Sequence, residues 1–109
     1  KASKFQADQI RTFNQITFSD ARLKEDIKLI NPIDNFNKLM KLNGYEYTNK
    51  ITKNKDKGVI AQQVESISPD LVDNQDRYKG VKYDNIIPML IEGIKYQQKE
   101  INILKSKLK

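Results

Sequence analysis

The sequence DNIIPMLIEGIKYQQKEINILKSKLK, residues 84–109, ends the chain with a regular pattern of apolar side chains. Asp84 and Asn85 are residue types that cap helix N-termini. Pro88 follows them, and a proline in the first helical turn loses least from its missing N–H group. The stretch therefore predicts one long helix, with Asp84 or Asn85 as its cap and Pro88 in its first turn.

The apolar positions of this helix are separated alternately by three and four residues, which is the spacing of a coiled coil. Ile86, Met89 and Ile91 add apolar surface to its first half, so we expect that half to pack on a globular part and the turns from Lys95 onward to project. Self-association would cover the projecting turns, whereas the alternative is an amphipathic helix lying on its own domain. The isoleucines and leucines do not themselves give the number of chains. We call the repeating positions the heptad seam: Ile87, Leu90, Ile94, Gln97, Ile101, Leu104 and Leu108.

The composition excludes several classes of site. The 109 residues suffice for one domain with a modest core, and 38% of them are hydrophobic while 31% are charged. The sequence contains no cysteine and no histidine, which excludes disulfides and thiolate chemistry and removes the usual general base near neutral pH. No run of about 18 apolar residues is present, so we expect no transmembrane helix and no membrane partner. Because phosphate-binding, dinucleotide-binding and calcium-loop motifs are also absent, we expect no cofactor and no metal.

The net charge of +6 raises the question of nucleic acid as a partner. The lysines gather in residues 50–57 and 95–109, which we interpret as a hairpin tip and the outer face of a helix. Aromatic side chains are not interleaved with them as base stacking would require, so we do not expect nucleic acid to bind. A basic coiled-coil module that binds nucleic acid remains the alternative, and steeply salt-dependent DNA binding would distinguish it.

The residues ahead of the long helix predict a mixed arrangement of short elements. Pro32 places a boundary at Asn31. After it, an apolar stripe over residues 33–42 predicts a helix that Asn31 or Asp34 caps and that Asn43-Gly44 ends, with Gly44 in the left-handed region.

Short strands follow this helix. Alternation predicts strands over residues 45–48, 59–61 and 78–83, with Ile51-Thr52 as a candidate extension of the first and residues 53–58 as the turn. A helical turn over residues 62–66 is stopped by Ser68-Pro69-Asp70. Phe13, Ile16 and Phe18 favour extended structure that enters from an upstream domain. Short strands interrupted by short helices describe an α+β domain.

The segment Ser19-Asp20-Ala21-Arg22-Leu23-Lys24, or S-D-x-R-x-K, places a hydroxyl, a guanidinium and an amine within six residues. Such a cluster is a candidate self-cleaving site. On spacing alone it is more typical of a turn that leads into a polar strand, because these residue types are common in loops. Only the rest of the chain favours the self-cleaving interpretation.

Three landmarks in order resemble the endosialidase-type intramolecular chaperone domain, which lies at the C-terminus of phage tail spikes, tail fibres and neck appendage proteins. The resemblance runs from about Ser19 to Lys109. One departure is visible: the family often has an acid where this chain has Gln63, and such an acid would assist the chemistry or hold Arg22. The landmarks are S-D-x-R-x-K, then Gly58-Val59-Ile60-Ala61-Gln62-Gln63-Val64-Glu65 with Pro69-Asp70-Leu71-Val72, then Val81-Lys82-Tyr83-Asp84 before the heptads.

The resemblance implies a fold and a division of the chain. The fold is α+β, with a small globular part of short strands and helices followed by a long C-terminal helix that forms a trimeric coiled coil. Residues 1–19 are then the end of an upstream spike or fibre region. Residues 20–109 are the chaperone domain, with a globular part at 20–83 and the helix at 84–109.

The resemblance also implies a function. A homotrimeric helper assembles the upstream part of its own chain in the host cytoplasm and then releases itself, leaving the upstream part in the virion tail or appendage. Ser19 is then the nucleophile, Lys24 its base, and Ser19–Asp20 the bond that breaks. A lysine acts as a base only if its pKa falls from about 10.4 towards neutrality, through burial or a nearby cation. Arg22 would be that cation or would orient Asp20. A structural trimerisation module without cleavage is the alternative.

The geometry of the cut leaves three routes. Attack by the Ser19 hydroxyl on its own carbonyl would close a strained four-membered ring. Attack on the Phe18 carbonyl closes a five-membered ring, but this N-to-O shift leaves Ser19 on the released piece. Attack on a neighbouring chain's carbonyl avoids both constraints and would couple cleavage to assembly, and we favour this route.

Overall fold

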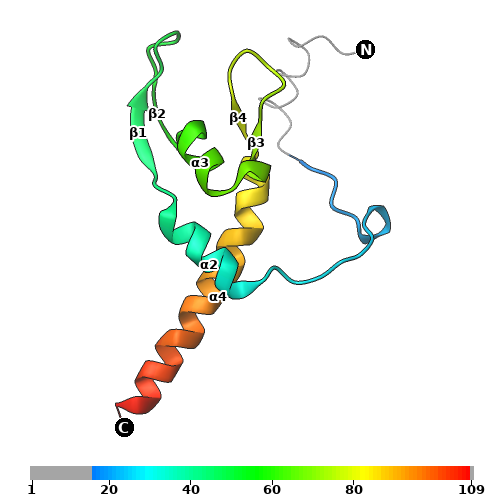
Figure 1. The fold of residues 1–109 in the computed structure, drawn as a ribbon, viewed down its shortest axis with the longest axis vertical. Coiled ribbons are helices and arrows are strands. Elements are labelled where there is room, and N and C mark those ends of the chain that lie inside the picture. The colour runs from blue at the N-terminus through cyan, green and yellow to red at the C-terminus, as the bar shows by residue number, and fades with distance from the viewer. Residues whose placement is uncertain (1–15, 109) are drawn as a thin grey trace.

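The computed structural model describes residues 16–108 (Figure 1). Its longest element is α4, Tyr83–Lys107, whose 25 residues span about 37 Å. The helix α2, Pro32–Lys41, crosses the middle of α4, and the C-terminal turns of α4 extend beyond the other elements (Figure 1). The arrangement confirms the α+β class with a long C-terminal helix. The structure describes one chain, so it does not test the trimer that the resemblance implies.

Three contacts fix the crossing of α2 and α4. The ring centroids of Phe36 and Tyr96 lie 4.8 Å apart. The amide of Asn35, which is 3% exposed, donates to the carbonyl of Met89 at 3.0 Å. Gly93 faces the end of the Leu39 side chain so closely that an added Cβ would collide with it. The two helices therefore approach at a position where α4 has no side chain.

A second cluster of apolar side chains forms the core beside this crossing. Its buried members come from four elements: α3 (Ala61–Ile67), the 3-10 helix η2 (Pro69–Leu71), β3 (Val72–Asp73) and α4. β3 pairs antiparallel with β4 (Gly80–Val81). This core is small: its buried apolar residues are Val64, Leu71, Val72 and Ile86.

Polar side chains hold the loops around the core. Glu65 accepts from Asn74 at 2.8 Å and pairs with Lys79 at 3.0 Å, which closes the loop between β3 and β4 onto α3. The hydrogen bond from Asn74, followed by that from Lys79, holds the pKa of Glu65 below its usual range. The Ser68 hydroxyl donates to Asp70 and lowers the pKa of that carboxyl in the same way.

The strands β1 (Tyr45–Thr48) and β2 (Lys55–Gly58) form an antiparallel hairpin that pairs Tyr45 with Gly58 and Thr48 with Lys55. In the connecting turn, the Asn49 side chain accepts from two backbone N–H groups. At the other end, the Tyr83 hydroxyl accepts the N–H of Val59 at 3.1 Å, and an added Cβ at Gly58 would lie 2.8 Å from that hydroxyl. The hairpin is thereby attached to the start of α4.

The structure corrects the strand predictions. The partner of β1 is residues 55–58 rather than 59–61, and Ile51-Thr52 lies in the turn. Because the hairpin is exposed on both faces, charged side chains are tolerated in β2 and apolar content does not mark the strand. The strand predicted over 78–83 is reduced to β4. Residues 16–18 of the predicted entering strand have no regular structure, and Phe13 lies outside the described residues.

The helix ends also differ from the predictions. Asn31, rather than Asp34, caps α2, accepting the N–H groups of Ile33 and Asp34. Gly44 is not in the left-handed region, because the chain leaves α2 through extended backbone at Leu42.

The start of α4 was predicted too late in the sequence. Its cap position is Lys82, which makes no side-chain cap, so Asp84 and Asn85 lie within the first turn and Pro88 lies inside the helix. The observed cap therefore lies two or three residues ahead of the predicted Asp84 or Asn85, and Tyr83, the first residue of α4, contacts the hairpin. Among residues 16–108, no helix is long and apolar enough to cross a membrane.

We expect Gly93→Val to destabilise the protein by about 2 kcal/mol, because the added side chain must push α2 away from α4. For a domain of this size the loss corresponds to a fall of roughly 10 °C in melting temperature. Thermal unfolding followed by circular dichroism at one protein concentration measures it. Lys99→Val places the same side chain on an exposed turn of α4 and serves as the control. Equal melting temperatures for the two variants would contradict the crossing described above.

Candidate functional site

The S-D-x-R-x-K motif lies on an extended segment, residues 16–31, which we call the arm. The arm runs away from the helices and returns to the start of α2 (Figure 1). Near its beginning, the Thr17 hydroxyl donates to the Asp84 carboxylate of α4 at 3.3 Å. Its far end is fixed because Asn31 caps α2. Both ends of the arm are thus attached to the α2–α4 pair.

A single helical turn shapes the motif. Residues Ala21–Leu23 form the 3-10 helix η1, and Asp20 is its cap. The Asp20 carboxylate accepts the N–H of Arg22 at 2.8 Å, and the Asp20 carbonyl accepts the N–H of Leu23 at 3.0 Å. Capping by an aspartate is a local property of the sequence. The turn reverses the chain between Ser19 and Lys24.

The reversal brings Lys24 back to Ser19. The Lys24 ammonium nitrogen donates to the Ser19 hydroxyl oxygen at 2.7 Å. This distance is within the range over which a proton passes between an amine and a hydroxyl. The structure therefore places the two predicted catalytic side chains in direct contact.

Arg22 points to Asp20. Its Nη2 lies 2.8 Å from Oδ2 of Asp20, and its Nε lies 3.1 Å from Oδ1. The side-chain hydrogen bond from Arg22, followed by that from its backbone N–H, holds the pKa of Asp20 below its usual range. The same pair raises the pKa of Arg22. Of the two roles predicted for Arg22, the observed geometry is that of a residue that orients Asp20.

Water surrounds the motif in the single chain. Ser19, Asp20, Arg22 and Lys24 are all exposed. The apolar side chains of the arm are exposed as well, with Phe18 at 90% and Leu29 at 82%. A lysine base requires removal from water or a nearby cation, and Arg22 is already paired. The single chain therefore has the contact between Ser19 and Lys24 but not the burial that would activate Lys24 as a base.

The heptad seam is also uncovered. Its apolar members are between 44% and 87% exposed, with Ile101 the lowest and Leu108 the highest. Beside the seam, an apolar groove of about 320 Å³ opens between α2 and α4. It is lined in part by Met40, Leu42 and Val59 on one side and by Leu90 and Ile94 of the seam on the other. The groove was not predicted from the sequence, although the apolar end of the 33–42 stripe was a signal for it.

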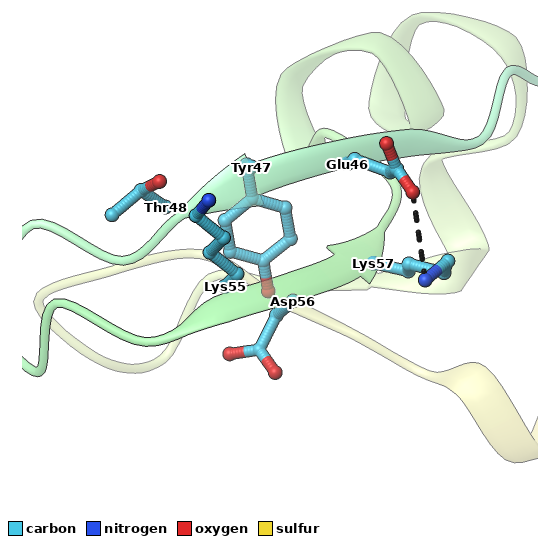
Figure 2. A pocket seen from close by; sticks show the side chains of 6 residues that line it. All are labelled: Glu46, Tyr47, Thr48, Lys55, Asp56 and Lys57. Carbon is cyan, nitrogen blue, oxygen red and sulfur yellow. Dashed lines mark ion pairs between the residues drawn. The ribbon is translucent and has the colours of Figure 1, made fainter.

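Another hollow, of about 370 Å³, lies on the β1–β2 hairpin (Figure 2). Six exposed side chains line it, and Glu46 and Lys57 form an ion pair across it at 3.5 Å. None of the motif residues reaches it. In the part of the chain from 16 to 108, no group of three acidic side chains could hold a metal ion. The candidate site is the arm, where Lys24 contacts Ser19.

The family model described as Chaperone of endosialidase matches residues 19–73. The chain belongs to this family. Chaperone of endosialidase domains are intramolecular chaperones and self-cleaving peptidases of phage tail proteins. No curated protein matches the chain.

The matched range begins at Ser19 and ends with β3, so the Chaperone of endosialidase match covers the motif, the hairpin and most of the core, while α4 follows it. Gln63, the predicted departure, lies on α3 within the match. Its side-chain oxygen accepts from the hydroxyl of Tyr45 at 3.0 Å. In this chain Arg22 is held by Asp20 instead of by a side chain at position 63.

Proposed function

We propose that residues 20–109 trimerise and fold an upstream phage tail spike or fibre, residues 1–19 being its end, and are then released by cleavage between Ser19 and Asp20. The contact of 2.7 Å between Lys24 and Ser19, at the first residue of the family match, is the observation that carries this proposal. Assembly takes place in the host cytoplasm, and the upstream part stays in the virion tail or appendage.

The chemistry needs no group beyond the motif. The Ser19 hydroxyl of one chain attacks the Ser19 carbonyl of a neighbour while Lys24 accepts the hydroxyl proton. The peptide bond breaks, an ester joins the two chains, and the proton passes to the departing amine of Asp20. Water then hydrolyses the ester and restores the hydroxyl. Attack between chains avoids the four-membered ring that attack within one residue would form.

Assembly also supplies the missing burial. Phe18, Leu23 and Ile27 are between 71% and 90% exposed, and they lie on both sides of the Ser19–Lys24 pair in the sequence. Neighbouring chains that cover these side chains would take Lys24 out of water at the same time. Desolvation disfavours the charged form of an amine. Cleavage would thus follow assembly.

The heptad seam supports self-association of the chain. Its apolar side chains lie on one face of α4 next to the groove between α2 and α4, so one surface continues from the seam onto α2. A monomer would leave this surface in water, at a cost of about 25 cal/mol per Å² of apolar area. The number three comes from the family.

Ser19→Ala and Lys24→Ala should each stop cleavage, reducing its rate by about 10³-fold or more, because one removes the nucleophile and the other its base. Intact-mass spectrometry of freshly refolded protein measures the reaction and should find Asp20 at the new N-terminus. Lys57→Ala removes a lysine from β2 and should cleave normally. Cleavage of Lys24→Ala at the wild-type rate would exclude the dyad, and a fragment that begins with Ser19 would indicate the N-to-O shift.

Leu104→Asn should dissociate the trimer, because it buries an amide in the seam. In a Ser19→Ala background, light scattering should give about three times the chain mass of 12.7 kDa before the change and about one chain mass after it. Lys99→Asn introduces the same side chain on the exposed face of α4 and should remain trimeric. If Leu104→Asn is also trimeric, the chains associate through another surface.

The chaperone role follows from the cost of assembly. Three fibre chains must meet in register before long-range strand pairing compensates for the lost freedom. A domain that trimerises by itself raises the effective concentration of the tethered chains to the millimolar range. Once the fibre is interlocked, removal of the domain eliminates the easy route back and gives kinetic stability.

Deletion of residues 20–109 from the full-length protein should therefore leave the upstream part monomeric or aggregated. The uncleavable Ser19→Ala protein should still form the trimeric fibre, yet unfold faster when heated. Size-exclusion chromatography and unfolding kinetics measure the two effects. Normal assembly without residues 20–109 would refute the chaperone role and leave a trimeric tail.

A further inference from the structure

The pair formed by Arg22 and Asp20 uses both oxygens of the carboxylate. Oδ1 accepts the backbone N–H of Arg22 at 2.8 Å and its Nε at 3.1 Å, while Oδ2 accepts Nη2 at 2.8 Å. The planar fork of a guanidinium fits a carboxylate in this way and fixes its orientation, which a single ammonium does not do. The Asp20 carboxylate is therefore held facing the Arg22 guanidinium.

This orientation matters because Asp20 is the acid next to the reacting serine. Asp20 and Lys24 lie at the two ends of the same short helical turn. A carboxylate that contacts an ammonium stabilises its charged form, and a charged lysine cannot accept the serine proton. In the structure Lys24 contacts the Ser19 hydroxyl, and Asp20 is turned to Arg22.

We propose that Arg22 is a positioning residue that keeps the Asp20 carboxylate away from Lys24, so that the lysine amine contacts the Ser19 hydroxyl instead of an acid. This proposal rests on the Ser19–Lys24 cleavage proposed above and assigns to the third residue of the motif its part in that reaction. The low pKa of Asp20 supports it, because the carboxyl stays ionised, and so paired, wherever a lysine base works.

Other charged groups near the motif are the same in the wild-type protein and in variants of Arg22 and Asp20. On the arm they are Glu25, Asp26 and Lys28, and on α4 Asp84 accepts from Thr17. All of them are exposed. A change in pH dependence that requires both Arg22 and Asp20 is therefore assigned to the pair.

The test is a double-mutant cycle on the full chain, with the cleavage rate measured by intact mass across a range of pH after refolding. The variants are Arg22→Ala, Asp20→Asn and the two combined. In Arg22→Ala the freed carboxylate turns to Lys24, so the pH of half-maximal rate should rise by about one unit and the rate at neutral pH fall about tenfold. In the combined variant the pH of half-maximal rate should return to that of Asp20→Asn alone.

Two outcomes would overturn the proposal. An unchanged pH of half-maximal rate in Arg22→Ala would show that Arg22 does not act through the protonation of Lys24. A combined variant that keeps the raised value would show that Arg22 acts otherwise than through Asp20. Lys57→Ala, which removes a distant cation, controls for net charge. Wild-type cleavage in Lys24→Ala would instead refute the dyad itself, and that outcome is distinguishable from both.

Discussion

The close approach of α2 to α4 is the contact on which the rest of the structure depends. Gly93 allows it, because any side chain at that position would meet Leu39. Asn35 fixes it with a buried hydrogen bond to the α4 backbone. The crossing then sets where the arm returns, since Asn31 at the end of the arm caps α2. It also forms one wall of the apolar groove beside the heptad seam.

The chain buries few apolar side chains for its size. Within residues 16–108 four hydrophobic side chains are buried, while the arm and the seam present isoleucines, leucines and phenylalanine to water. A small domain gains little from burial, and its conformational entropy is lost in full. A chain with this distribution would gain stability by association. For the trimeric helper proposed above, dependence on its own copies would couple its folding to the event that it promotes.

At the site, the contact between Lys24 and Ser19 and the activation of Lys24 have different requirements. A local turn, capped by Asp20, suffices to place Lys24 against Ser19. As the proposed base, Lys24 would need a change in its surroundings, which six exposed residues cannot provide. Such a division would keep the peptide bond intact in single chains, and it would make the self-cleaving step depend on assembly.

The sequence by itself determined the local features. The spacing of the heptad seam predicted the long helix, which depends on neighbours within a few positions. Three motifs in order indicated the family, and that resemblance implied Ser19 and Lys24 as the catalytic pair. Only the tertiary structure decided where β2 begins, how α4 starts and that the Arg22 guanidinium pairs with Asp20. The first two outcomes depend on contacts between residues far apart in the chain, such as that of the Tyr83 hydroxyl with the Val59 N–H, and the third depends on the side-chain geometry of two nearby residues. Local propensity does not fix such contacts, because their energies come from packing and side-chain geometry that exist only after folding.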